Sequence, residues 1–331
     1  MKKLNKTAKI VIAVALVIAV CVPVGIVIGR CTIGKKADIV VTMFPQYDWV
    51  KRIIGKNPAD FTVRYLLSNG IDPHNYNPSV QDAAAIIDSK LFIYTGEADV
   101  RIEKILNQNP RKKRREIAMM DIVETKALEF DHDEEDCDGD CFHPEDMDDE
   151  HVWLSLKMAR LIIAEIAETL ADMDKKNAEY YMTNAENYIE RLRRLDQDYE
   201  DAVEQARQRL GRNPRVLFAD RFPFLYLMDD DYIEWDAAFG GCAIASQITF
   251  DTRIRLNGVI DTWDLGAILI LERSNNRSVA NIMVNEAKGR GRDLRIRVLN
   301  SMQSVTGAQS ETARYYTIMR RNLEVLKEAM A

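Results

Sequence analysis

Short apolar runs alternate with amphipathic stretches in the first half of the chain, beyond residue 36. The runs that are typical of buried strands span residues 39–44, 63–67, 91–94 and 116–122. Helical spacing near residues 49–54, and a capping box in which Asp82 follows Ser79 by three residues, predict helices between them. Strands that alternate with short helices predict a parallel, three-layer α/β unit.

The middle of the chain is patterned as helix. One apolar stripe at helical spacing contains Leu161, Ile162, Ile166, Leu170 and Met173. A second stripe runs from Tyr181 to Leu210 in steps of three or four residues, with charged residues between. At about 1.5 Å per residue, a helix over residues 177–210 would be roughly 50 Å long. That length suits either a surface helix of one domain or, as we favour, a rigid strut between two domains.

Strand and helix patterns alternate again after Pro214. Strands are predicted at residues 216–219, 232–235, 267–271 and 296–299, and helices at residues 278–287 and 312–330. The fold class predicted is therefore α/β, with two similar three-layer α/β/α lobes joined by one long rigid helix. The expected divisions are a leader over 1–36, an N-terminal lobe over 37–175, a linking helix over 176–211 and a C-terminal lobe over 212–331.

The charge of the chain is concentrated in one segment. The 331 residues carry a net charge of −7, which argues against nucleic acid as a partner. Residues 131–150 hold twelve Asp or Glu and no Lys or Arg, so the remainder of the chain is net positive. Three of the four histidines lie in or directly beside this acidic segment: His132, His143 and His151.

The N-terminus has the pattern of an export signal. Four lysines within the first nine residues precede an uncharged apolar run from Ile10 to Gly29. The run is long enough to span a bilayer. Cys31 follows Ile28, Gly29 and Arg30, which is similar to a bacterial lipobox except for the arginine. Lipidation at Cys31, an uncleaved anchor and ordinary cleavage are the three outcomes considered, and each places the body of the protein outside the cytoplasm.

The acidic segment has two interpretations. Such runs are usually solvated loops whose charges repel one another. The alternative is an auxiliary metal-capture loop, because the imidazoles of His132 and His143 and the thiols of Cys137 and Cys141 are metal ligands. The two cysteines are also close enough in sequence to form a disulfide.

Two further histidines lie in segments that lead into predicted helices. His74 follows Asp72 and Pro73 in a loop after a predicted strand, and His151 opens the helix after the acidic segment. Loops at the carboxyl ends of parallel strands are common ligand sites, and Zn²⁺ favours imidazole ligands completed by carboxylate or water. Asp220, beside Arg221, could form an ion pair or place its carboxylate toward such a site. Walker A, HExxH and GxSxG motifs are absent from the sequence, so it does not indicate an enzyme.

In the order of its motifs the chain resembles the zinc- and manganese-binding solute-binding proteins of bacterial ABC importers, the ZnuA/TroA type. The segments that carry the resemblance are residues 72–79, the acidic segment, residues 150–155, the long helix, residues 219–224 and residues 300–305. The resemblance implies two α/β lobes, a metal cleft between them and little movement on loading.

The resemblance also implies metal ligands. His74 and His151 match two histidines of the family, whereas the third falls at Ala219, next to Asp220, and an acidic ligand falls at Asn300. An acidic residue expected shortly after Cys242 is missing as well. Asp220, Glu272 or the acidic segment are the candidates to complete the site.

We therefore expect a monomeric, extracytoplasmic lipoprotein that is held at the membrane by a lipid anchor or an N-terminal helix. It would capture Zn²⁺, with Mn²⁺ second, and deliver it to an ABC permease. The main alternative is an adhesin or scaffold that keeps the fold with a degraded metal site. An extracellular metallohydrolase is a more remote alternative, because no motif supplies a general base.

Overall fold

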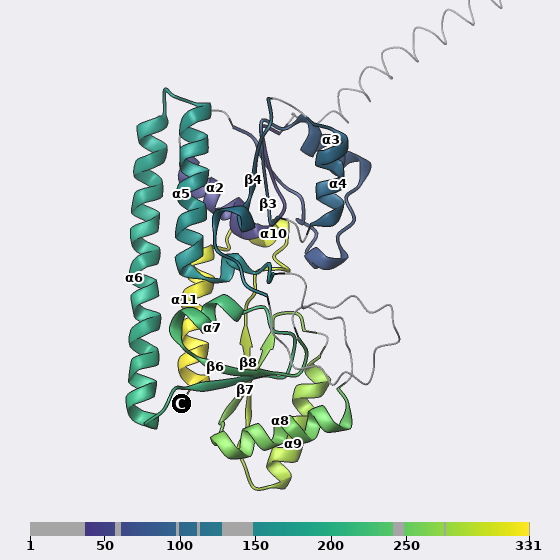
Figure 1. The fold of residues 1–331 in the computed structure, drawn as a ribbon, viewed down its shortest axis with the longest axis vertical. Helices are drawn as coiled ribbons and strands as arrows, with labels where there is room; N and C mark the ends of the chain where they lie inside the picture. Colours follow the sequence, from purple (N-terminus) through teal and green to yellow (C-terminus); the bar gives the residue numbers. More distant parts are fainter. Residues whose placement is uncertain are drawn as a thin grey trace, which may run out of the picture.

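The computed structural model describes residues 37–56, 61–96, 99–110, 113–127, 148–240, 248–274 and 276–330. It contains two four-stranded parallel sheets, which Figure 1 shows one above the other. The first has the order β2-β1-β3-β4, with β1 at Ile39–Val41, β2 at Val63–Tyr65, β3 at Leu91–Tyr94 and β4 at Arg115–Ala118. The second has the order β6-β5-β7-β8, with β5 at Arg215–Phe218, β6 at Glu234–Ala237, β7 at Ala267–Leu271 and β8 at Arg295–Leu299.

Helices pack around both sheets. Those of the N-terminal lobe are α2 (Phe44–Ile54), α3 (Val80–Asp88), α4 (Val100–Gln108) and α5 (Leu156–Met173), with short 3₁₀ helices η1 (Pro73–Asn75), η2 (Met119–Ile122) and η5 (Val152–Leu154). Around the second sheet lie α7 (Leu225–Asp231), α8 (Phe250–Trp263), α9 (Arg277–Gly289) and α11 (Tyr315–Ala329). The short α10 (Gly307–Ser310) lies beside the first sheet, where the N–H of Gly307 donates to the carbonyl of Ser68 (Figure 1). The long helix α6 (Ala178–Leu210) runs beside both lobes (Figure 1). The predicted fold class is confirmed.

Three predicted boundaries are wrong for local reasons. Phe44 begins α2 instead of ending β1, because Pro45 in the first turn lacks an N–H that would be unpaired there anyway. Residues 119–122 form η2 and do not extend β4. Tyr232 has a φ of 57°, which a strand residue cannot adopt, so β6 begins only at Glu234.

Helix α6 is bonded to both lobes. Asn184 donates to the carbonyl of Ile53 at 2.9 Å in the N-terminal lobe, and Tyr199 donates to the carbonyl of Met319 at 2.6 Å in the C-terminal lobe. One hydrophobic core cluster contains buried residues of α6, of the first sheet and of α11. The strut is therefore the interpretation that these contacts favour, since the helix packs on both lobes along its length.

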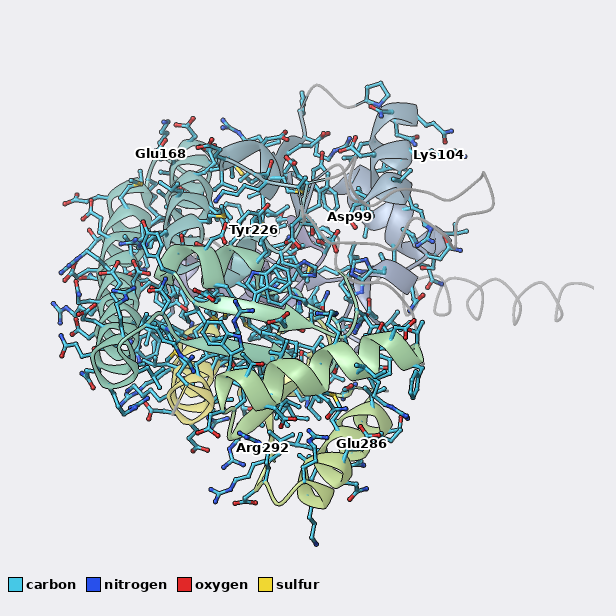
Figure 2. The ribbon with its side chains drawn as sticks, turned by 60° about the horizontal axis from the view of Figure 1, so that its bottom comes forward. Asp99, Lys104, Glu168, Tyr226, Glu286 and Arg292 are labelled. Atoms are coloured by element: carbon cyan, nitrogen blue, oxygen red, sulfur yellow. The ribbon has the colours of Figure 1, made fainter. Side chains whose placement is uncertain are left out.

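Buried polar contacts fix the segment before α5 to the C-terminal lobe. The Trp153 indole donates to the carbonyl of Ser301 at 2.9 Å, and the Tyr315 hydroxyl donates to the carbonyl of Trp153 at 2.7 Å. Tyr226, near the middle of the molecule in Figure 2, donates its hydroxyl to the carbonyl of Asp149 at 2.5 Å. These bonds set the position of the residues between Asp149 and Trp153.

Among the helices that the structure describes, none combines the length and the apolar character that a membrane crossing requires.

The carboxylate of Asp231, at the end of α7, is buried, and we expect it to make the stability of the protein depend on pH. Neither of its oxygens has a hydrogen-bond partner in the described structure, and burial, followed by the charges of Asp196 and Asp230, raises its pKa to about 8. Because an ordinary Asp has a pKa of about 3.9, folding takes up a proton between these values, and the free energy of unfolding falls as the pH rises through them. We expect Asp231→Asn to stabilise the protein by about 1–3 kcal/mol above pH 8 and to have little effect near pH 4.

Thermal unfolding of the parent and the variant on either side of this range measures the effect. Asp229→Asn is the matched control, because Asp229 lies on the same helix but is exposed and paired with Lys126. A difference in melting temperature that is the same at acidic and alkaline pH would contradict the titration of Asp231.

Candidate metal centre

His74 is held in the loop that follows β2. The Asp72 side chain caps η1 by accepting from the backbone N–H of His74 at 3.1 Å, and Pro73 occupies the first turn. Arg101 donates to the carbonyl of Tyr76 at 2.5 Å and so ties the loop to α4. The imidazole is 25% exposed, so it borders on solvent while its position is set by the loop.

His151 is almost fully buried, and the carboxylate of Asp149 sets the tautomer of its ring. Asp149 accepts from the backbone N–H of His151 at 2.8 Å and lies 3.1 Å from its Nδ1. Because a carboxylate only accepts, Nδ1 carries the proton and Nε2 keeps its lone pair. A carboxylate behind the ring is the usual support of a metal-binding imidazole.

Both imidazoles converge with a carboxylate. His74, Glu150 and His151 each offer a ligand atom, and these three atoms all lie within 4.8 Å of one another. Oε1 of Glu150 is 3.1 Å from Nε2 of His74 and 4.0 Å from Nε2 of His151. Two nitrogens and one oxygen are ligand types that Zn²⁺ prefers, and they would supply three of the four ligands of a tetrahedral zinc site.

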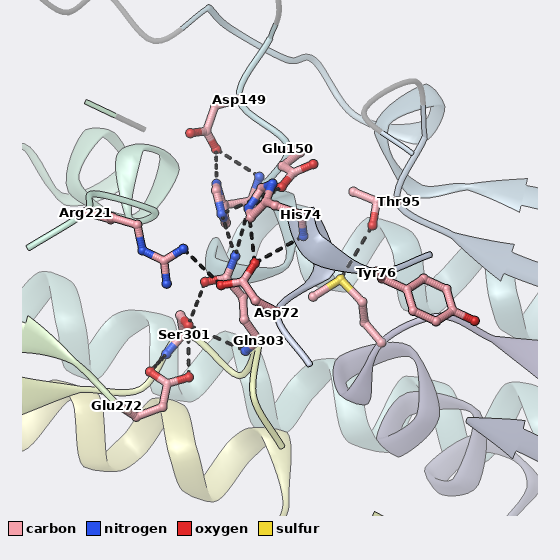
Figure 3. Close-up of polar contacts among 12 residues, drawn as sticks. Asp72, His74, Tyr76, Thr95, Asp149, Glu150, Arg221, Glu272, Ser301 and Gln303 are labelled. Atoms are coloured by element: carbon pink, nitrogen blue, oxygen red, sulfur yellow. Dashed lines mark hydrogen bonds and ion pairs between the residues drawn. The ribbon is translucent and has the colours of Figure 1, made fainter. Parts of the chain in front are cut away.

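The amide of Gln303 fills the space between the two rings. Its Nε2 lies 3.4 Å from Nε2 of His74 and 3.1 Å from Nε2 of His151. Figure 3 shows Gln303 below His74, on the loop that also carries Ser301. The hydroxyl of Ser301 is 3.0 Å from the Gln303 Oε1 and 2.9 Å from the Glu272 Oε1. Rotating the amide by half a turn exchanges Nε2 and Oε1, so Gln303 is able to present an oxygen to a cation held by the rings.

The structure does not bring Asp220 into this group of ligand atoms. Its carboxylate is buried and accepts from the backbone N–H of Leu271, the side chain of Asn276 and the backbone N–H of Arg221, each at 2.9 Å. The Arg221 side chain does not pair with Asp220, as was considered from the sequence. It pairs with Asp72 at 2.9 Å and so joins the two lobes. Asp220 thus supports the C-terminal lobe.

Glu272 is also outside the group. It accepts from the backbone N–H of Ser301 at 2.7 Å and from its hydroxyl, and burial raises its pKa to about 7. Asn300, where the resemblance places an acidic ligand, uses its side-chain oxygen to accept from the backbone of Met302 at 2.8 Å. Glu272 therefore supports the loop that carries Gln303.

The pair of Asp72 and Arg221 lies beside the histidines. Oδ1 of Asp72 is 4.0 Å from Nε2 of His74, whereas its Oδ2 receives the guanidinium of Arg221. Burial would raise the pKa of Asp72, but His74 and Arg221 outweigh burial and lower it. Arg221 therefore holds the carboxylate of Asp72 next to His74, a candidate ligand (Figure 3).

Gln303 was not predicted as a ligand, and Glu150 was predicted only as part of the acidic segment, without being named. Glu150 is the last acidic residue before His151, and Gln303 lies in the segment 300–305 that carried the resemblance. The signal for Glu150 was its adjacency to a candidate ligand, hidden among eleven other acidic residues in the segment. The predicted residues Cys31, His132, Cys137, Cys141 and His143 lie outside the described residues, as does Cys242.

A family model and curated relatives of this chain both describe zinc-binding proteins. Residues 39–329 match the model of ZnuA, the zinc-uptake complex component A, periplasmic. The chain is 28% identical over 308 residues to the zinc-binding lipoprotein AdcA of Streptococcus pneumoniae serotype 4, and the match covers 90% of this chain and 57% of that protein. The chain therefore spans little more than half the length of such curated relatives.

Solved structures show the same fold. The Zn(II)-bound ZnuA-like domain of Streptococcus pneumoniae AdcA superposes with a TM-score of 0.67 at 26% identity, over 89% of this chain and 99% of that domain. The laminin-binding protein Lmb of Streptococcus agalactiae, described as a bifunctional protein with adhesin and metal-transporting activity, gives 0.70 at 19% identity, over 88% and 99%.

Proposed function

Because the chain belongs to the ZnuA family, the periplasmic component A of zinc-uptake complexes, we propose that it captures Zn²⁺ outside the cytoplasm and delivers it to an ABC permease. The observation that carries the proposal is the convergence of His74, Glu150 and His151, whose ligand atoms lie within 4.8 Å of one another. The family is one of solute-binding proteins, and a cation held by these residues is cargo.

The proposed ligands are Nε2 of His74, Nε2 of His151, a carboxylate oxygen of Glu150 and, after rotation of its amide, Oε1 of Gln303. Two nitrogens and two oxygens supply the four ligands that Zn²⁺ prefers in a tetrahedral site. Imidazole nitrogen favours Zn²⁺ over Mn²⁺, which takes carboxylate, carbonyl and water ligands more readily. Asp149 orients one ring from behind, and its loss would weaken binding without removing a ligand.

A competition titration of Zn²⁺ and Mn²⁺ into the metal-free chain tests this function. We expect one high-affinity site with Zn²⁺ bound more tightly than Mn²⁺, as the order of metal affinities predicts. A parallel variant that lacks residues 131–147 separates this site from the acidic segment, where His132, Cys137, Cys141 and His143 would form an auxiliary capture loop. Weak binding that disappears with the deletion would contradict capture by the histidines.

Gln303→Glu is predicted to tighten zinc binding. A carboxylate at this position would add a negative charge to the ligands, and carboxylate oxygen is one of the usual ligands of Zn²⁺, whereas the amide is neutral. We expect the affinity for Zn²⁺ to rise by about tenfold or more, and that of Gln303→Ala to fall. Ser304→Ala, in the same loop, is the control that should leave the affinity unchanged. Equal affinities of the parent and both Gln303 variants would exclude this residue as a ligand.

We also propose how the protein is held at the membrane, and we keep an adhesin or scaffold as the alternative function. The apolar N-terminal run and Cys31 support an extracytoplasmic protein anchored to the membrane through a lipid on that cysteine, and mass spectrometry of the mature N-terminus tests it. An adhesin or scaffold is the weaker alternative, supported by the fold that the chain shares with Lmb. It predicts that His74→Ala would leave function intact.

A further inference from the structure

A pocket with a mixed polar and apolar lining, separate from the proposed metal ligands, lies at the carboxyl end of the second sheet. Its volume is about 490 Å³, and it lies among the loops after β7 and β8 and the start of α11. Its lining does not include His74, Glu150, His151 or Gln303. The carboxyl edge of a parallel sheet is where such folds bind ligands, and the volume suits a small organic or inorganic molecule.

Three arginines give the pocket its charge. Arg273, Arg314 and Arg321 line it, and within the described part of the chain none of them lies within ion-pair distance of a carboxylate. By contrast, the outer face of the same lobe neutralises its arginines. Arg292 pairs there with Asp264 at 2.5 Å, and Arg253 pairs with Glu286 at 3.3 Å (Figure 2). The pocket therefore gathers the positive charges of Arg273 and Arg321, together with that of Arg314. Burial raises the pKa of the neighbouring Asp48, and the charge of Arg314 opposes that rise.

The remaining polar groups of the lining are mostly donors. The side-chain oxygen of Asn300 already accepts from Met302, and that of Gln309 accepts from Thr306, so each residue has its amide NH₂ left to donate. The carboxylate of Glu272 is occupied by the backbone N–H and the hydroxyl of Ser301. One guanidinium nitrogen of Arg314 already donates to the carbonyls of Glu311 at 3.0 Å and Ala313 at 2.5 Å. Its other N–H groups, the guanidinium groups of Arg273 and Arg321 and the two amides are donors of the kind that recognises an oxyanion.

The backbone at the pocket is strained. Arg273 follows β7 directly and has a φ of 56°, in the left-handed region that side chains other than Gly, Asn and Asp rarely adopt. Strained residues are retained where the surrounding structure imposes them, and they cluster at binding sites. Residue Gly70 of the N-terminal lobe has no Cβ and lets the Arg273 guanidinium pack against it, since a Cβ there would lie 2.8 Å from the guanidinium nitrogen.

We propose that this pocket binds a small oxyanion with more than one negative charge, of the phosphate or polycarboxylate class. Arg314, the N-cap of α11, and Arg321, about two helical turns further along, would bind the anion together with Arg273 from the opposite loop. The proposal does not depend on metal transport, because the ligands of the metal and the lining of the pocket are different residues.

Isothermal titration of the full-length chain with inorganic phosphate in one arm and citrate in the other tests the proposal. Metal is removed beforehand by dialysis, since citrate also chelates Zn²⁺. We expect saturable binding of one molecule per chain in at least one arm, weakened by salt because the charges attract. The arm that binds more tightly identifies the phosphate or the polycarboxylate class.

Matched substitutions at the start of α11 and along it decide whether the anion binds in this pocket. Arg314→Gln and Arg321→Gln should each weaken binding by about tenfold or more, the usual effect of losing a charge-assisted hydrogen bond. Arg320→Gln, an exposed neighbour that does not line the pocket, should leave it unchanged. Circular dichroism of all three variants checks that each of them folds. An absence of saturable binding in both arms, or an equal loss in Arg320→Gln, would overturn the proposal.

Discussion

Replacing both imidazoles, in a His74→Ala and His151→Ala double variant, is expected to abolish high-affinity Zn²⁺ binding. Residues that merely orient a metal ligand change affinity by 10–100-fold, so we expect each single variant to lose more than about 100-fold. His151 should be the more sensitive position, because its ring is buried and its Nε2 is aimed by Asp149, whereas His74 is partly exposed. Competition against a fluorescent chelator measures the loss.

The control for this experiment lies in the same loop. Asn75 is exposed at the end of η1, so Asn75→Ala changes the loop without changing a proposed ligand. Thermal unfolding of every variant shows whether the fold has been kept. If the folded double variant bound Zn²⁺ as tightly as the parent, the two histidines would not be ligands, and the acidic segment would become the candidate site.

Acidification is expected to release Zn²⁺ steeply. A proton and the metal compete for the same Nε2 lone pair, and an unperturbed imidazole titrates near pH 6.5, so the affinity should fall as the pH drops below about 6.5. With two imidazole ligands, the dissociation constant should rise by about 100-fold for each pH unit well below that value. Asp72 would not contribute in this range, since His74 and Arg221 overcome the effect of burial and lower its pKa.

A second group near the site titrates in the same range and needs its own control. Burial raises the pKa of Glu272 to about 7, and this residue bonds to Ser301, whose hydroxyl is also 3.0 Å from the Gln303 Oε1. Glu272→Gln removes that titration while keeping the shape of the side chain. If imidazole protonation is the cause, the variant keeps the steep slope. A zinc affinity independent of pH in the parent would rule out binding by the histidines.

Much of the fold was predictable because its signals are local. Apolar runs predicted the buried strands β1, β3 and β7, since a strand that is buried on both faces is apolar throughout. The stripe from Tyr181 to Leu210 predicted α6 in the same way. The errors arose where backbone geometry overrode the pattern, as at Pro45 and Tyr232. Helix α8 was missed because it buries only Leu256 and Ile260, which leaves little apolar periodicity to detect.

The candidate site was predictable only in part. His74 and His151 could be proposed because a histidine is rare in this chain and each precedes a helical segment. Gln303 could not, because an amide side chain has no chemical signature in a sequence, and only the loop that Ser301 and Trp153 hold in place brings it to the two rings. Asp220 and Glu272 were chosen for their charge, although backbone N–H groups already use their oxygens.

The sequence by itself determined the two α/β lobes, the helix between them and the family, because hydrophobic periodicity and motif order are properties of neighbouring residues. Only the tertiary structure decided which side chains meet. The Gln303 amide lies 3.4 Å from Nε2 of His74 and 3.1 Å from Nε2 of His151, although Gln303 is 229 and 152 residues from these histidines along the chain. Such proximity depends on the packing of both lobes against α6, to which residues far apart in the sequence contribute together.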